Sequence, residues 1–379
     1  MLESIKAFCD SLLKLGLPGF DLSVYHKGRS VIRYMNGYSD LENKIPVQGN
    51  ERYNLYSCSK PVTCAAALRL WEQGAFSLAD RLSDYMPEFS DMTYISQNGV
   101  KPTSRPILIR HLFEMTAGFS YDCFSPSLQK ARAETEGKCR LRDVMRYLAK
   151  EPLLFEPGER WEYGFCHDVL AALVEELTGE SFEDHIKKTV FDPLGMQDST
   201  FLLPQGELAS VAPLYKIIKG RVLNEGKEIG EYKLGSEYAS GGAGLVSTVN
   251  DYMKFLEALR NGRILNEETL ALMTKNRLAP EQKQAFWLQS PHGYGLGVRC
   301  PIGVSPYEDF GWGGAACSYF AVDLKNEISL FFGAHALSPL ILKQRGLLYR
   351  LIRAALVEPS DFDRVFEECG QLMGFSANR

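Results

Sequence analysis

Residues 55–89 read LYSCSKPVTCAAALRLWEQGAFSLADRLSDYMPEF. We predict a helix over 57–73, because this run is rich in apolar residues and Gly74 follows it as a C-terminal cap. Ser57 and Lys60 open that helix three residues apart, so their side chains share one face, one turn apart. Pro61 falls in the first turn, where its missing N–H costs little, and it helps to set where the helix begins.

The Ser-x-x-Lys spacing can carry nucleophilic chemistry. An amine one turn from a hydroxyl can take the serine proton if its pKa falls from about 10.4 to about 7–8, a change worth about 4 kcal/mol. Partial burial and a neighbouring cation or phenol can produce such a change.

The spacing occurs three times, at Ser11/Lys14, Ser57/Lys60 and Ser127/Lys130. Only Ser57 follows an extended run, Arg52–Tyr56, and opens an apolar helix. The N-terminus of a helix offers unpaired N–H groups and the positive end of its dipole, which can stabilise an oxyanion. At this point Ser57 has two interpretations, a helix N-cap or a nucleophile.

Composition narrows the class of protein. With 379 residues, 45% of them hydrophobic and 23% charged, the chain is long enough for about two domains, or for one domain with a large insertion. The formal net charge is −5 and no basic stripe occurs, which argues against nucleic-acid binding. No run reaches 18 uninterrupted apolar residues, so we expect no membrane span.

The nine cysteines and the first residues predict a location. An odd count without any Cys-x-x-Cys pair argues against a disulfide framework and a zinc ribbon, and favours a reducing compartment. Glu3 and Lys6 interrupt the apolar residues of the N-terminus, so we expect no signal-peptide core there. We expect a cytoplasmic protein whose oligomeric state is open.

The order of the predicted elements indicates the architecture. An amphipathic helix over 2–15 precedes two β-rich runs around Lys27-Gly28-Arg29, a pattern typical of a hairpin. Further helices are predicted at 107–116, 141–149, 166–178, 182–190, 248–260 and 338–357, and β-like runs at 294–300, 307–312, 316–322 and 328–334. The stretch over 200–237 is polar.

We therefore predict an α/β (α+β) fold with a central antiparallel sheet flanked by N- and C-terminal helices. Residues 1–75 and 200–379 would form the sheet domain, and 76–199 an inserted all-helical domain, with the active site between them. Residues 120–140 are the least regular part of the insertion and could form a rim or lid.

Several motifs of other enzyme classes are absent. The chain has no Gly-x-Ser-x-Gly, His-Glu-x-x-His, P-loop or Gly-x-Gly-x-x-Gly sequence. None of the six histidines is paired at metal-ligand spacing, and we interpret them as structural or exposed. The interpretation is weakest for His167, because that residue is close to Tyr163 in the sequence. We expect no metal and no cofactor.

Five segments together resemble the serine β-lactamase-like superfamily, which includes class C β-lactamases, DD-peptidases and family VIII carboxylesterases. They occur in family order, at 55–89, 107–121 (ILIRHLFEMTAGFSY), 155–201 (beginning FEPGERWEYGFCHDV), 239–273 (beginning ASGGAGLVSTV) and 307–332 (beginning YEDFGWGGAACSYF). The resemblance implies a β-lactamase/DD-peptidase-like fold.

It also implies catalytic roles. Ser57 matches the acyl-accepting serine, Lys60 the lysine that helps to activate it, and Tyr163 the general base and acid of the Tyr-x-Asn motif. A tyrosine needs a cation beside it to lose a proton near neutrality, which agrees with Lys60 as its neighbour. Taken singly, Tyr163 would be interpreted as a structural, half-buried tyrosine.

The third motif of the family matches Trp312-Gly313-Gly314, on a strand at the edge of the pocket. Two glycines allow a substrate to approach the backbone closely. By the resemblance, the backbone N–H groups of Ser57 and Ala315 form the oxyanion hole. The structural alternative is a strand tryptophan beside a glycine bulge.

Two departures from the family pattern bear on the substrate. Phe165 replaces the asparagine of the second motif, and Trp312 stands where lactamases and peptidases usually carry Lys or His, a cation that would recognise a carboxylate. Tryptophan offers stacking and apolar area instead. Tyr121 corresponds to a loop that borders the pocket, so it is a candidate contact of the substrate.

We thus expect a serine hydrolase acting through an acyl-enzyme, a carboxylesterase on short-chain apolar esters with a small-molecule ester as its partner. The alternatives are weak β-lactamase or D-amino-acid peptidase/amidase activity in the same site, an acyltransferase, and a catalytically silent ligand-binding homologue. We also expect Cys58 and Cys166, which flank the site, to respond to thiol reagents.

Overall fold

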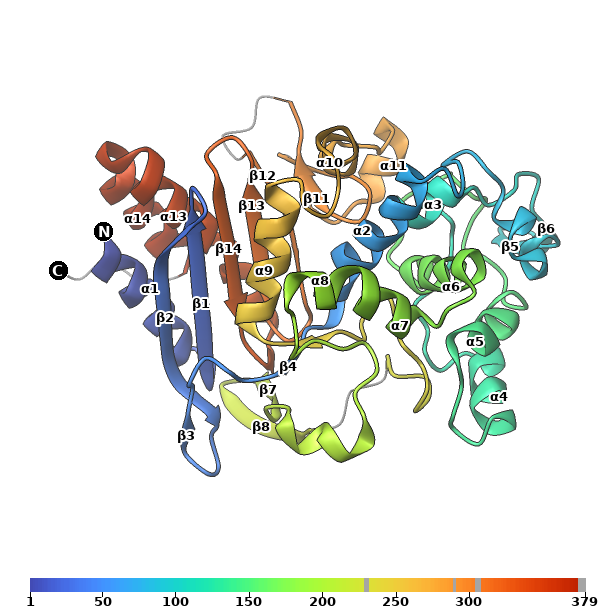
Figure 1. Cartoon of the computed structure of the whole chain (residues 1–379). Helices are drawn as coiled ribbons and strands as arrows, with labels where there is room; N and C mark the ends of the chain where they lie inside the picture. The colour runs from blue at the N-terminus through green and yellow to red at the C-terminus, as the bar shows by residue number, and fades with distance from the viewer. Residues whose placement is uncertain (228–231, 289–290, 304–307, 374–379) are drawn as a thin grey trace.

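The two ends of the chain build one sheet. The computed structural model describes residues 1–227, 232–288, 291–303 and 308–373 (Figure 1). Strands β1 (Gly19–His26) and β2 (Arg29–Asp40) form the hairpin predicted around Gly28. Strand β1 also pairs antiparallel with β14 (Ile328–Gly333), more than 300 positions later in the sequence.

Within the described residues the main sheet has eight strands, in the order β10-β11-β12-β13-β14-β1-β2-β3, and every neighbouring pair is antiparallel. Its remaining strands are β3 (Ile45–Pro46), β10 (His292–Tyr294), β11 (Arg299–Pro301), β12 (Asp309–Gly313) and β13 (Tyr319–Asp323). The single strand predicted over 294–300 is wrong: Gly297, with φ of +89°, lies in a loop that separates β10 from β11.

Helices cover both faces of this sheet, which confirms the predicted fold class (Figure 1). Helices α1 (Leu2–Lys14), α13 (Leu347–Val357) and α14 (Phe362–Leu372) share a core with Phe332. On the opposite face α9 (Val249–Arg260) places Tyr252 on Phe331, with 4.4 Å between ring centroids. The alternation of a strand explains why the adjacent Phe331 and Phe332 serve different cores.

Residues 76–199 contain several helices, but the expectation of an all-helical region is wrong, because they also contain the hairpin of β5 (Thr93–Ser96) and β6 (Gly99–Pro102). Their helices are α3 (Ile109–Phe113), α4 (Pro126–Glu134), α5 (Leu141–Leu148), α6 (Cys166–Thr178), α7 (Phe182–Ile186) and α8 (Asp192–Leu194). The helix predicted over 107–116 is shorter because Met115 adopts a φ of +56°. The helix predicted over 182–190 turns into a π-helical turn at Lys187–Phe191.

One hydrophobic cluster joins this helical region to the sheet. Helix α2 (Ser59–Glu72) contributes to the same cluster as α6, α9 and the sheet residue Phe331. The division into domains at 75/76 and 199/200 therefore stays a prediction.

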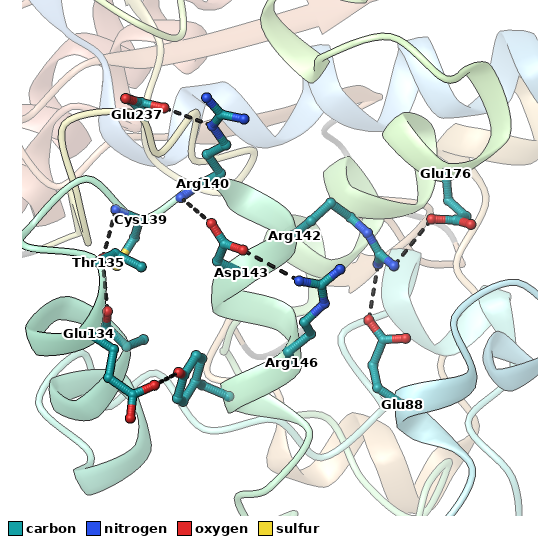
Figure 2. Close-up of polar contacts among 12 residues, drawn as sticks. Glu88, Glu134, Thr135, Cys139, Arg140, Arg142, Asp143, Arg146, Glu176 and Glu237 are labelled. Carbon is teal, nitrogen blue, oxygen red and sulfur yellow. Dashed lines mark hydrogen bonds and ion pairs between the residues drawn. The ribbon is translucent and has the colours of Figure 1, made fainter.

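The end of segment 120–140 is anchored by ion pairs (Figure 2). Arg140 pairs with Glu237 at 2.8 Å, and Arg142 of α5 pairs with both Glu88 and Glu176 at 3.1 Å. The backbone N–H of Ser236 also donates to the carbonyl of Gly137 at 2.9 Å. The contacts of Gly137 and Arg140 hold the end of the segment against Ser236 and Glu237.

The polar stretch over 200–237 contains two strands that the sequence did not predict, β7 (Leu214–Ile218) and β8 (Arg221–Gly226). Strand β7 pairs with β15 (Ala336–Leu337), and β4 (Tyr53–Asn54) pairs with β9 (Val246–Ser247). The second pairing brings the residues before Ser57 next to the glycine-rich residues 240–244.

The remaining helices are α10 (Glu267–Thr274), α11 (Pro280–Ala285) and α12 (Pro339–Gln344). The single helix predicted over 338–357 is broken, because Arg345 and Gly346 separate α12 from α13. Across the part of the chain that the structure describes, no helix has both the length and the apolar character needed to cross a bilayer.

Candidate active site

Ser57 lies in a 3-10 turn, Tyr56–Cys58, that leads directly into α2. Tyr56 has a φ of +46°, and its backbone N–H donates to Oδ1 of Asn54 at 3.3 Å. A left-handed backbone is costly for a large side chain, and such strain clusters at functional sites. The turn places Ser57 on the wall of a cleft.

The structure brings Ser57, Lys60 and Tyr163 together. The hydroxyl of Tyr163 donates to Ser57 Oγ at 2.5 Å, and Lys60 Nζ donates to the same oxygen at 3.3 Å. Lys60 Nζ also lies 4.4 Å from the centroid of the Tyr163 ring, within cation–π range. A hydroxyl between an amine and a phenol has two groups within reach of its proton.

Lys60 is fully buried, and the shortest hydrogen bond of its amine is to a backbone carbonyl oxygen. Its Nζ donates to the carbonyl oxygen of Gly242 at 2.7 Å and to Tyr121 Oη at 3.4 Å. Burial, and then the charge of Asp168, raises the pKa of Tyr121 well above 10, so this phenol stays protonated.

Asp168 organises the turn that carries Gly242. It is buried, and its Oδ1 accepts hydrogen bonds from the hydroxyls of Tyr238 at 2.8 Å and Ser240 at 2.6 Å. Burial raises the pKa of Asp168, while the Ser240 hydrogen bond and the charge of Lys60 oppose that rise. The carboxyl group thus acts on Lys60 through residues 240–244.

Strand β12, which borders the cleft, ends against the turn that holds Ser57. The N–H of Gly314 donates to the carbonyl of Ser318 at 2.9 Å, and the Ser318 hydroxyl donates to the carbonyl of Leu55 at 3.3 Å. A Cβ at Gly314 would lie 2.2 Å from Leu55 O, so only glycine fits. Ser57 and Ala315 consequently line the same cleft, as an oxyanion hole built from their N–H groups requires.

The cleft has a volume of about 900 Å³ and strongly aromatic walls. The Tyr163 and Trp312 rings stack at 6.1 Å, and Trp287 lies 4.9 Å from Tyr163. Tyr121 and Tyr232 face each other at 4.9 Å on the cleft wall. Gly313 and Gly314 complete the wall beside Trp312.

Phe165 is placed differently from the other candidates. Its ring is 1% exposed and packs 5.0 Å from the ring of Tyr121, which itself lines the cleft. The structure therefore places Phe165 behind Tyr121, where it supports the wall instead of forming it.

Sequence reasoning missed four groups at this site: Asp168, Gly242, Trp287 and Arg345. Trp287 is 56% exposed at the cleft, and its neighbour Phe286 in an otherwise polar stretch was a usable hint. Arg345 lies between two helices and donates to the carbonyls of Gly314 and Ser318, both at 2.6 Å. No local pattern marks it.

The other groups considered from the sequence lie elsewhere. His167 is fully buried against Cys64 and the carbonyl of Phe113, and burial lowers its pKa to about 3. Ser11 donates to the carbonyl of Phe8 on α1, and Ser127 lies on α4. All nine cysteines are buried.

The fold and the cluster at Ser57 define a serine hydrolase. The chain belongs to the beta-lactamase family, whose sequence profile it matches over residues 5–343.

Named relatives agree with this assignment. Lovastatin esterase of Penicillium rubens is 30% identical over 310 residues, which cover 76% of this chain and 74% of the relative. Esterase EstB of Burkholderia gladioli is 28% identical over 299 residues, 70% of this chain and 71% of the relative. The solved structure of EstCE1, a hydrolase with promiscuous acyltransferase activity, is 25% identical, with a TM-score of 0.77 over 92% of this chain and 97% of its own.

Proposed function

We propose that the protein is a carboxylesterase that acts through an acyl-enzyme on Ser57. The observation that carries the proposal is the convergence of Tyr163 Oη, at 2.5 Å, and Lys60 Nζ, at 3.3 Å, on Ser57 Oγ. Both candidate proton acceptors therefore reach the nucleophile without rearrangement.

The reaction follows from this arrangement. Ser57 Oγ bonds to the ester carbonyl carbon while its single proton passes to the Tyr163–Lys60 pair, which reacts in the form that has one proton fewer, and the N–H groups of Ser57 and Ala315 stabilise the oxyanion. Tyr163 then protonates the departing alcohol. Water, activated by the same pair, attacks the acyl group and frees Ser57.

The substrate class we propose is short-chain, apolar esters. Aromatic side chains line the cleft that contains Ser57, and Trp312 replaces the cation expected in lactamases. The names of lovastatin esterase, EstB and EstCE1 point to ester chemistry as well.

The test is hydrolysis of p-nitrophenyl acetate and butyrate by wild type, Ser57→Ala and the matched variant Ser11→Ala. We expect the first variant to lose activity and the second to keep it. Equal turnover by wild type and Ser57→Ala would refute the proposal. Labelling of Ser57 by a fluorophosphonate, read by intact mass, separates an enzyme with another substrate from a silent ligand-binding homologue.

A second candidate has its own supporting observation. Lys343, Arg345 and Arg350 from the α12–α13 region line the cleft, although Arg350 pairs with Glu368 at 2.8 Å. These cations favour substrates that carry a carboxylate, such as β-lactams or D-amino-acid peptides. The presence of Trp312 in place of a cation argued against such substrates in the sequence analysis. Comparing nitrocefin with p-nitrophenyl butyrate decides between the candidates.

Two finer points belong to the same proposal. Transfer of the acyl group to an added alcohol, measured as product partitioning, would identify an acyltransferase. The odd number of cysteines, with no Cys-x-x-Cys pair among them, supports a reducing compartment such as the cytoplasm.

A further inference from the structure

A second cavity, with a volume of about 420 Å³, lies apart from the catalytic cleft. None of Ser57, Lys60 and Tyr163 lines it. Three segments distant in sequence form its wall: the stretch before and along α3, the loop at Pro157–Gly158, and the stretch around α11.

The lining is strongly cationic. Three arginines, Arg105, Arg110 and Arg277, are among the lining residues. Glu114 is the one lining residue with a carboxylate. Glu114 Oε1 lies 3.3 Å from Arg277 Nε. Among the described residues neither Arg105 nor Arg110 makes an ion pair, so positive charge exceeds negative charge here.

His111 adds a neutral donor to the same wall. Burial, and then the charges of Arg110 and Arg105, lowers the pKa of His111 to about 4, so the imidazole is neutral at pH 7. The backbone N–H of Leu108 donates to its Nδ1 at 3.2 Å, which leaves the ring proton on Nε2. Nε2 faces Gly158, where an added Cβ would come within 3.1 Å.

We propose that this cavity binds the phosphoryl group of a small molecule, held by Arg105, Arg110 and Arg277. Guanidinium groups present paired N–H donors that match the oxygens of a phosphate. The volume exceeds that of a bare phosphate, so an organic group has room beside it. This binding site is independent of the function proposed for Ser57.

Two tryptophans lie close to a helix that lines this cavity, so their fluorescence can report binding. Gln282 of α11 lines the cavity and donates to the carbonyl of Gly158 at 2.7 Å. Phe286 directly follows this helix, and its ring lies 4.9 Å from that of Trp161; the next residue, Trp287, lies 5.0 Å from Trp161. An occupant of the cavity should therefore change tryptophan fluorescence.

The experiment titrates the whole protein with inorganic phosphate, pyrophosphate and citrate at constant ionic strength, following Tm and tryptophan fluorescence. We expect a saturable rise in Tm with phosphate or pyrophosphate. Arg105→Met and Arg110→Met should each weaken binding at least tenfold, while Arg263→Met, an exposed arginine outside the cavity lining, should not.

Glu114→Gln should change the affinity for phosphate in the opposite direction to the arginine variants. Removing that carboxylate should tighten binding severalfold, whereas a merely structural cluster would only lose stability. Because Arg105 is exposed, Arg105→Met decides the matter if Arg110→Met does not fold. The proposal is overturned if neither phosphate compound gives a saturable response, if Arg105→Met binds like wild type, or if citrate alone saturates the site.

Discussion

The amine of Lys60 donates a 2.7 Å hydrogen bond to the carbonyl oxygen of Gly242, 182 positions away in the sequence. This bond directs the amine toward Ser57 and depends on the turn that Asp168 holds through Ser240. The position of the lysine thus depends on a glycine-rich turn as much as on the helix that carries it.

Gly242→Ala should therefore damage catalysis. A Cβ there would lie 2.5 Å from Asp168 Oδ2 and 3.2 Å from Tyr121 Oη, so the turn must shift. We expect kcat for p-nitrophenyl butyrate to fall at least tenfold and the free energy of unfolding to fall by about 1–3 kcal/mol. Gly206→Ala, with nothing within 4 Å of its added Cβ, is the control. Full activity in Gly242→Ala would contradict the role of the turn.

The backbone of Tyr56 allows strain to be measured. At a φ of +46°, glycine is favoured over alanine. Tyr56→Gly should therefore be more stable than Tyr56→Ala by about 1 kcal/mol in urea unfolding, although both lose the ring. At exposed Phe124, where φ is not positive, we expect no advantage of Gly over Ala. The same order at both positions would argue against strain before Ser57.

Trp287 offers a test of substrate contact. It is 56% exposed and lies 4.9 Å from the Tyr163 ring, so it is available to an apolar substrate. Trp287→Ala should raise KM for p-nitrophenyl butyrate about 5- to 20-fold with little change in kcat, because it removes binding area and no proton-transfer group. Phe124→Ala, which removes an exposed ring outside the cleft lining, should leave KM unchanged. A fall in kcat alone would contradict this role.

His335 should make the fold sensitive to acid. Burial lowers its pKa from 6.5 to about 4, so the unfolded chain binds a proton between these values and the folded chain does not. Its contribution to stability is complete above pH 6.5 and is lost as the pH falls toward 4, by up to about 1.4 kcal/mol per pH unit. His335→Asn can retain the donor to the Ala212 carbonyl, which Nδ1 meets at 2.8 Å. Urea unfolding at pH 7, 6 and 5 should show a shallower pH dependence for the variant. Parallel profiles would contradict the assignment.

The cysteines should react very slowly with thiol reagents in the folded protein. Burial raises the pKa of Cys58 to about 11 and that of Cys166 to about 12, which disfavours the reactive thiolate and corrects our expectation from their positions in the sequence. A chromogenic disulfide reagent should label nine thiols in denaturant and none within minutes under native conditions. Rapid native labelling of Cys58 would show that the turn at Ser57 opens.

Elements with a strong local pattern were predicted well. The hairpin of β1 and β2 turns where predicted, and α6 and α9 lie within one residue of their predicted limits, because their hydrophobic periodicity and turn residues are local. The predicted limits of a helix and a strand were wrong where a single positive φ ended the element, at Met115 and Gly297. Strands β7 and β8 were not predicted because they carry too few buried side chains to show a hydrophobic pattern.

The sequence by itself placed Ser57 and Lys60 one turn apart, because a spacing of three residues in a helical segment leaves little choice, although α2 begins at Ser59 and Ser57 lies in the 3-10 turn before it. It also carried the family pattern that singled out Tyr163 and Trp312. Only the tertiary structure decided that Tyr163 meets Ser57 across 106 positions, that Gly242 holds the amine, and that Phe165 lies behind Tyr121. Such contacts depend on how sheet and helices pack, and packing joins residues that no local period relates.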